Sequence, residues 1–161
     1  MIRDAEVGDG AAIAEIYNHY IQNTIVTFEE DSVEKEEMQK RLMYVSKKLP
    51  WLVFEQDKQI LGYAYASEWK SRCAYRHSLE TTVYLKDGMS GKGIGSKLYA
   101  ELIRRLKHKD YHTLIGGISL PNEGSVALHQ KFGFEKIAQF KEVGFKFGKW
   151  IDVGYWQLIL E

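Results

Sequence analysis

A glycine-rich loop at the start of an amphipathic helix is the clearest chemical feature of this sequence. The stretch from Gly88 to Lys107 reads GMSGKGIGSKLYAELIRRLK, with four glycines within eight residues. Glycines let the backbone approach a ligand and take positive φ, and a helix start offers unpaired N–H groups with partial positive charge. This combination is typical of a loop that binds an anion such as a phosphate.

Four interpretations of this loop compete. A P-loop needs Ser or Thr after Lys92, where the chain has Gly93. A dinucleotide fingerprint needs G-x-G-x-x-G, but Ser96 stands where the last glycine belongs, and no acid ends the next strand to hold a ribose. The third interpretation is a pyrophosphate from a cofactor other than NAD, and the fourth is a turn that binds nothing. Spacing alone does not decide between them.

The composition describes a neutral chain with enough residues for one domain. The chain has 161 residues, with 22 Lys and Arg against 22 Asp and Glu. We therefore expect a single domain over 1–161, and neither nucleic acid nor a membrane as partner. The charged N-terminus is unlike a secretory signal. The single cysteine, Cys73, fits a reducing cytoplasm.

The periodicities predict an α/β fold in which helices cover a mixed sheet. The predicted order is one strand, two helices, three strands, a helix, a strand, a helix and two strands. Asp9 is expected to cap the first helix and Ser32 to precede the second. The glycines of the buried strand Thr113–Ser119 suggest that another backbone comes close, and Gly133 should end the last helix.

Five blocks carry a family resemblance: IYNHYIQNTIVTFEE, YRHSLETTVYL, GKGIGSKLYAELI, NEGSVALHQKFGF and VGFKFGKWIDVGYWQ. In this order they resemble the GCN5-related N-acetyltransferases (GNAT), and in particular the branch that acetylates phosphinothricin and methionine sulfoximine. The resemblance covers nearly the whole chain. It implies a GNAT fold, with a mostly antiparallel sheet of about seven strands, about four helices and a splay between the fourth and fifth strands.

The resemblance also implies acetyl-coenzyme A as cosubstrate. The family signature, Gln/Arg-x-x-Gly-x-Gly/Ala, falls on Ser90, Gly93 and Gly95, so Ser90 replaces the usual Gln or Arg. Backbone N–H groups should supply most of the pyrophosphate contacts, so we expect binding to survive with altered affinity. The expected cofactor residues are Thr82, Val83 and Tyr84 beside the pantetheine, the loop residues Gly91, Lys92, Gly93, Ile94, Gly95 and Ser96, and Asn122 and Ser125. Asn122 is equally suited to cap the following helix.

The resemblance implies that Glu80 is the general base, because it aligns with the proposed base of the branch. A base is needed since an ammonium must lose a proton before it can attack a thioester. The alternative is a solvated carboxylate on an alternating strand. His129 is the candidate acid for the leaving thiolate, with a helix-surface histidine as an equal alternative. Tyr99 is expected to be a packing residue. Cys73 is disfavoured as a nucleophile because no histidine spacing supports it.

The acceptor site is expected to combine an aromatic wall with charged groups. Phe28 could line the pocket and Glu29 could hold the substrate ammonium. Arg72 or Arg76, with Tyr75, could bind the substrate carboxylate as a planar fork, with Arg72 preferred. The alternatives are an ordinary connecting loop and solvated loop charges.

The predicted function is acetylation of the amino group of a small amino acid or analogue by direct transfer. The alternatives are a protein or peptide N-acetyltransferase and a non-catalytic coenzyme A sensor. The five histidines show no zinc-type spacing, so no metal is predicted. The basic run Arg104–Lys109 is interpreted as a solvated helix end. The branch resemblance and the aromatic-rich C-terminal strand GYWQLIL favour a homodimer, with aromatics that fill the core as the alternative for this strand.

Overall fold

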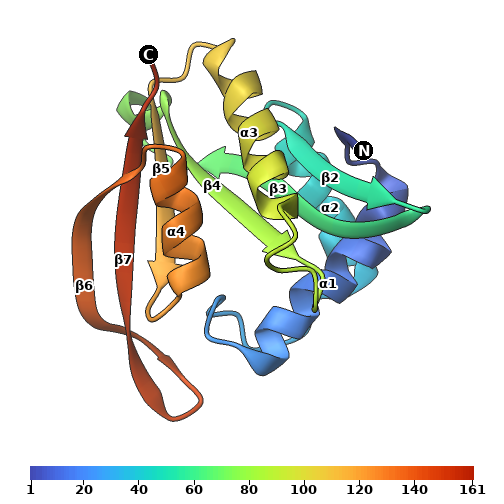
Figure 1. The fold of residues 1–161 in the computed structure, drawn as a ribbon, viewed down its shortest axis with the longest axis horizontal. Coiled ribbons are helices and arrows are strands. Elements are labelled where there is room, and N and C mark those ends of the chain that lie inside the picture. The colour runs from blue at the N-terminus through green and yellow to red at the C-terminus, as the bar shows by residue number, and fades with distance from the viewer.

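One mixed sheet forms the centre of the computed structural model, which describes residues 1–161 (Figure 1). Its seven strands are β1 (Ile2–Asp4), β2 (Trp51–Gln56), β3 (Gln59–Glu68), β4 (Ser78–Leu85), β5 (Thr113–Ser119), β6 (Glu135–Lys146) and β7 (Lys149–Ile159). They lie in the order β1-β2-β3-β4-β5-β7-β6. Only β4 and β5 are parallel, and every other neighbouring pair is antiparallel. The predicted mixed, mostly antiparallel sheet is confirmed.

Four α-helices cover the sheet on both faces: α1 (Gly10–Asn23), α2 (Lys35–Ser46), α3 (Ile94–Lys107) and α4 (Glu123–Lys131). Alternation along β2 sends Leu52 into the core beneath α3 and Val53 into the core beneath α1 and α2. This explains why the run Trp51–Phe54 is apolar and buried throughout. In Figure 1, α3 and α4 lie on the near face. None of these helices is both long and apolar enough to cross a bilayer.

The parallel pair of strands is bonded over only part of its length. The register between them covers Ser78–Glu80 on β4, although β4 continues to Leu85 and β5 extends to Ser119. Beyond the paired part the two strands diverge (Figure 1), which confirms the predicted splay between the fourth and fifth strands. The divergence leaves a gap in the sheet between the starts of α3 and α4.

The two N-terminal helices begin differently from the prediction. α2 starts at Lys35, and the Ser32 hydroxyl accepts a hydrogen bond from Gln22 at 2.7 Å instead of preceding the helix directly. Asp9 does stand at the N-cap position of α1, but its carboxylate makes no cap hydrogen bond to that helix. It pairs with Arg3 at 2.8 Å. Ser32 and Asp9 thus each bond to a residue of another segment, and neither side chain caps the helix that follows it.

The C-terminal strand lies inside the sheet and has no free edge. β7 is bonded to β5 on one side and to β6 on the other, and Trp156 is only 2% exposed. Trp156 therefore fills the core, although Ile159 of the same strand is 48% exposed. Six of the exposed large apolar side chains lie on β6 and around its turn into β7: Ile137, Phe140, Val143, Phe145, Phe147 and Trp150.

Candidate active site

A cavity of about 450 Å³ occupies the gap between β4 and β5. It takes residues from both faces of the sheet. Tyr84 contacts the ring of Tyr17 on α1, with ring centroids 5.2 Å apart, whereas the Thr81 hydroxyl lies 3.1 Å from the Tyr99 hydroxyl on α3. Adjacent β4 residues point to opposite faces, so the cavity connects the α1 side of the sheet with the α3 side. It is lined by Val26, Thr27, Phe28, Glu80, Thr81, Thr82, Val83, Tyr84, Tyr99, Gly117, Ile118, Ser119, Asn122, Ser125, His129, Val143, Val153 and Tyr155.

Glu80 is the one acidic side chain in this lining. Its Oε1 lies 3.8 Å from the position that a Cβ at Gly117 would take, so the carboxylate is directed toward β5. Burial raises the pKa of Glu80, and no neighbouring charge or hydrogen bond contributes to the shift. A half-buried carboxylate with a raised pKa and no fixed partner is suited to accept a proton from a bound amine.

The edge of β4 that faces the gap can make strand-like hydrogen bonds. The N–H of Lys86 donates to the carbonyl of Leu61 on the β3 side at 2.9 Å. The β3–β4 register is regular, so the backbones of Thr82 and Tyr84 also bond toward β3. By the same alternation, the N–H and C=O of Val83 point into the gap. Of Thr82, Val83 and Tyr84, which are predicted to lie beside the pantetheine, only Val83 directs its backbone N–H and C=O into the gap.

The loop between β4 and α3 has the backbone that its glycines predict. Gly91 and Gly93 have φ of +76° and +78°, and a Cβ on either would meet nothing within 4 Å. Other residues adopt this left-handed conformation only at a cost. Gly93 is the N-cap of α3, so the N–H groups of Ile94, Gly95 and Ser96 have no partner inside the helix. These unpaired N–H groups are the ones that the predicted anion cradle requires.

Two ammonium groups flank this loop. Lys92 is exposed, and its Nζ lies 3.8 Å from Met89 Sδ. Lys131 extends from α4, and its Nζ donates to the Ser96 hydroxyl at 3.0 Å. The positive charge that is missing at Ser90 is therefore present beside the loop from two other positions.

Asn122 caps α4, as one of its two interpretations predicts. Its Oδ1 accepts a hydrogen bond from the Ser125 backbone N–H at 3.1 Å. Both residues also line the cavity. The start of α4 therefore borders the cavity, whereas α3 contributes Tyr99 to the lining and none of its first residues.

His129 is buried, at 3% exposure, and so is not a helix-surface residue. Its Nδ1 lies 2.7 Å from the Ser125 carbonyl, which can only accept, so Nδ1 carries a proton. Its Nε2 lies 2.9 Å from the Tyr99 hydroxyl. Burial lowers the pKa of His129, so the ring is neutral and Nε2 carries no proton. A neutral ring has no proton to give there, which counts against the predicted acid role.

Two adjacent glycines on β5 make room for side-chain rings and not for a second backbone. A Cβ at Gly116 would lie 2.4 Å from His129 Nε2, and a Cβ at Gly117 would lie 3.1 Å from the Tyr155 ring. The expectation that another backbone comes close to these two glycines is therefore wrong. The ring of His129 thus lies directly over β5, and Tyr99, at 1% exposure, is a core residue as predicted.

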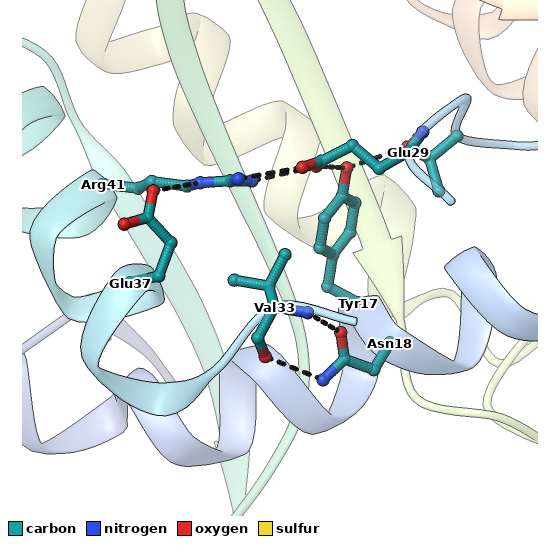
Figure 2. Close-up of polar contacts among 7 residues, drawn as sticks. Tyr17, Asn18, Glu29, Val33, Glu37 and Arg41 are labelled. Carbon is teal, nitrogen blue, oxygen red and sulfur yellow. Dashed lines mark hydrogen bonds and ion pairs between the residues drawn. The ribbon is translucent and has the colours of Figure 1, made fainter. Parts of the chain in front are cut away.

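Phe28 and Glu29 serve different parts of the structure. Phe28 lines the cavity. The Glu29 carboxylate is bonded to both terminal nitrogens of Arg41, at 2.8 and 2.9 Å, and to the hydroxyl of Tyr17 (Figure 2). Hydrogen bonds from Arg41 are the main reason that the pKa of Glu29 is lowered. A carboxylate already paired with arginine is poorly suited to hold a substrate ammonium, so Glu29 orders its own segment.

The three remaining candidates lie outside the cavity lining. Arg72, Tyr75 and Arg76 are on the exposed loop between β3 and β4. This loop begins beside the cavity, because Trp69 meets the lining residue Tyr155 edge-on with ring centroids 5.6 Å apart. No Lys or Arg lines the cavity. A carboxylate on an acceptor would therefore need a cation from the surroundings, and this loop is one source.

The family model described as an acetyltransferase (GNAT) domain matches residues 2–154. The chain belongs to the GNAT acetyltransferase family. It is 36% identical to the L-methionine sulfoximine/L-methionine sulfone acetyltransferase of Salmonella typhimurium, over 99% of this chain and 94% of the relative. These findings confirm the predicted N-acetyltransferase and its branch.

Two solved structures resemble this GNAT acetyltransferase closely. A phosphinothricin acetyltransferase from Sinorhizobium meliloti, in complex with AcCoA, has a TM-score of 0.96 and 35% identity, covering 99% of this chain and 88% of that one. A ribosomal-protein-alanine N-acetyltransferase from Brucella melitensis has a TM-score of 0.97 and 38% identity, covering 99% of each chain.

Several residues that line the cavity of this GNAT enzyme carry no signal in the sequence, among them Thr27, Val143 and Tyr155. Tyr155 pairs across strands with Gly117. An aromatic residue opposite a strand glycine is a recognisable pattern, but only after the order of the strands is known. Thr27 and Val143 come from a loop and an edge strand, whose approach to the gap has no local signal.

Proposed function

We propose that this enzyme uses acetyl-coenzyme A to acetylate the amino group of a small amino acid or a close analogue, such as phosphinothricin or methionine sulfoximine. The position of Glu80 carries the proposal, since its half-buried carboxylate lines the cavity between β4 and β5, on the strand that leads into the loop before α3. The names of the Salmonella and Sinorhizobium proteins support this substrate class. The limited volume of the cavity also favours a small acceptor.

The residues present fit the cosubstrate. The free N–H groups at Ile94, Gly95 and Ser96 would hold the pyrophosphate, and Lys92 and Lys131 would add positive charge beside it. The backbone of Val83 would bond to the pantetheine along the open edge of β4. Acetyl-coenzyme A supplies an acetyl group activated as a thioester.

Glu80 acts as the general base in this proposal. It takes one proton from the acceptor ammonium, directly or through a water, and so frees the lone pair for attack on the acetyl carbonyl. Burial raises the pKa of Glu80 toward that of the amine. The smaller difference between the two pKa values makes proton transfer to Glu80 less unfavourable. Direct transfer in a ternary complex needs no enzyme nucleophile. The Ser125 hydroxyl lies 3.5 Å from His129 Nδ1 in the lining, but that nitrogen carries the proton donated to the Ser125 carbonyl and cannot act as its base.

The leaving thiolate needs no dedicated acid in this scheme. Burial raises the pKa of Tyr99 and lowers that of His129, and both shifts disfavour donation of a proton to a thiolate. A thiol with an ordinary pKa of about 8.5 can leave as the anion. It then takes up, through solvent, the second proton that the attacking nitrogen loses as the amide forms. We therefore assign the Tyr99–His129 hydrogen bond the role of orienting α4 against the gap.

Arg72 is our candidate for binding the acceptor carboxylate, with Arg76 and Tyr75 on the same short loop. The support is that the cavity contains no cation of its own while this loop begins beside Tyr155. A guanidinium presents two parallel N–H donors to a carboxylate. Replacing Arg72 with Met should raise the acceptor KM and leave the acetyl-coenzyme A KM unchanged.

The test is steady-state acetylation of phosphinothricin, methionine sulfoximine and a panel of free amino acids, with Glu80→Gln as the decisive variant. We expect this isosteric change to lower kcat by about 10²–10⁴-fold. Glu68→Gln is the matched control, because Glu68 is an exposed glutamate on the neighbouring strand. Unchanged turnover in Glu80→Gln would show that Glu80 is not the general base. No turnover with any free amino acid would remove the substrate class.

The name of the Brucella structure supports a second candidate, acetylation of a protein N-terminus. Peptides that begin with alanine, assayed beside free amino acids, separate the two. A coenzyme A-binding sensor without activity is the third possibility. It would show thermal stabilisation by acetyl-coenzyme A without thiol release from any acceptor.

We also propose that the enzyme is a homodimer. The support is the exposed apolar surface on β6 and its turn, which includes Phe145, Phe147 and Trp150 at 55%, 57% and 64% exposure. Contiguous exposed apolar groups favour burial against a partner. Light scattering behind size exclusion tests this, and a monomer mass at assay concentrations would remove it.

A further inference from the structure

The segment between α1 and α2, residues 24–34, contains no helix or strand. It nevertheless supplies three residues to the cavity: Val26, Thr27 and Phe28, which we call the acceptor wall. They lie on the α1 side of the gap, the side that Glu80 faces. Irregular backbone is held in one conformation only by contacts with other elements, so the position of the acceptor wall depends on what anchors this segment.

Helices α1 and α2 anchor the later half of the segment. The side chain of Asn18 accepts from the Val33 N–H at 2.7 Å and donates to the Val33 carbonyl at 2.9 Å. Arg41 and Tyr17 hold Glu29 (Figure 2). Helix α1 also reaches the wall itself, since the Tyr17 and Thr27 hydroxyls lie 2.8 Å apart and the Thr24 N–H donates to the Tyr20 carbonyl at 3.2 Å. None of these contacts uses the carbonyls of Thr24 and Thr27.

Lys146, at the end of β6, holds these two carbonyls. Its ammonium donates to the carbonyls of Thr24 and Thr27, both at 2.8 Å. The residue is only 3% exposed, and both of these acceptors are carbonyls and not carboxylates. Removing a lysine from water is costly unless its donors are satisfied. The two carbonyls lie more than 100 residues away in the chain, so this buried contact ties the C-terminal hairpin to the acceptor wall.

Gly144 on the same strand receives the ring of Phe28. A Cβ at Gly144 would lie 2.3 Å from Phe28 Cζ, with two further ring carbons within 3 Å. Any side chain at this position must therefore displace the ring. Within three residues, β6 fixes the backbone of the acceptor wall through Lys146 and the aromatic side chain of the wall through Gly144.

We propose that Lys146 and Gly144 are positioning residues that set the affinity of the enzyme for its acceptor by holding Thr27 and Phe28 against the gap. The effect on the acceptor KM rests on the proposed function, whereas the anchoring of Thr27 and Phe28 does not. The cofactor loop and the edge of β4 lie on other elements. The acetyl-coenzyme A KM should therefore be independent of both residues.

Lys146→Met tests this, because it keeps the length of the side chain and removes its donors. We expect the acceptor KM to rise tenfold or more, with the acetyl-coenzyme A KM unchanged within twofold. Lys149→Met is the matched control, since Lys149 pairs with Lys146 across the same hairpin and is exposed. It should leave both constants unchanged. A residue that only stabilised the fold would not separate the two KM values.

Hydrogen exchange gives a readout that does not depend on turnover. In Lys146→Met, amides in residues 24–30 should exchange at least tenfold faster, while those of α3 and β4 stay as in the wild type. If Lys146→Met does not fold, Gly144→Ala keeps the ammonium and moves Phe28, and it should raise the acceptor KM in the same selective way.

An unchanged acceptor KM together with unchanged exchange would overturn the proposal, as would equal increases in both KM values. If the wild-type enzyme acetylates no free amino acid, the proposed function fails and hydrogen exchange alone decides the structural inference. Faster exchange confined to residues 24–30 would then support the anchoring role, and unchanged exchange would refute it.

Discussion

Two glycines in the cofactor loop should respond in opposite ways to the same substitution by alanine. Gly93 has a φ of +78°, and a Cβ there would meet nothing within 4 Å. Gly95 lies in the first turn of α3, and its Cβ would contact Leu128 and Leu85, both at 3.7 Å. The first position has room but a conformation unsuited to L-residues. The second has a helical conformation and ordinary van der Waals distances.

These differences determine how much each substitution changes the free energy of unfolding. The left-handed conformation costs an L-residue about 1–2 kcal/mol, so Gly93→Ala should lower the free energy of unfolding by about that amount. Alanine is about 0.8–1.0 kcal/mol better than glycine inside a helix, and no clash offsets this at Gly95. Gly95→Ala should therefore raise the free energy of unfolding by roughly 0.5–1 kcal/mol. The two variants should differ by roughly 2 kcal/mol.

Urea denaturation of the two variants without ligand measures this difference, and calorimetric titration with acetyl-coenzyme A measures its consequence. Gly93→Ala should also weaken binding, because any relaxation of φ turns the N–H groups away from the pyrophosphate. Gly95→Ala should bind normally, since its Cβ points into the protein toward Leu128 and not toward the ligand. A destabilised Gly95→Ala, or equal stability of the two variants, would refute the reasoning.

Three further predictions follow from the site. As pH falls, kcat/KM should decline through the pKa of Glu80, above the ordinary glutamate range because burial raises it, and Glu80→Gln should lack this step. Gly116→Ala should lower the free energy of unfolding by about 1–3 kcal/mol in urea denaturation, since its Cβ would lie 2.4 Å from His129 Nε2. Arg41→Met should lower stability at neutral pH, measured by denaturant titration. The deficit should shrink in acid, as Glu29, whose folded pKa is lowered, becomes protonated.

Much of the fold could be predicted because its signals are local. The alternation of "HSLETTVYL" defined β4, and the glycine-to-helix transition after Gly91 defined the cofactor loop. Positive φ at Gly91 and Gly93 is a property of the loop itself. The position at which the sheet opens is predicted by the family resemblance and not by a local sequence pattern. Local pattern contains no information on where two parallel strands stop pairing.

The environments of the polar side chains could not be predicted, because distant segments determine them. Glu29 was assigned to the substrate from its neighbours in the sequence, but Arg41, one helix later, occupies its carboxylate. His129 was placed on the helix surface or at the thiolate, whereas Gly116 lets its ring lie over β5. Lys146 received no role because its partner carbonyls are in the N-terminal third of the chain.

The opening of the sheet explains how one strand can serve both substrates. Along β4, the side chain of Glu80 points to the α1 face, the backbone of Val83 points into the gap, and the side chain of Thr81 points to the α3 face. The proposed base on one face and the proposed cofactor edge in the plane of the sheet thus lie within four residues of rigid backbone. A slip of one residue against β3 would turn Glu80 to the α3 face and the backbone of Val83 toward β3. Catalysis should therefore depend on the β3–β4 register more strictly than on any single side chain other than Glu80.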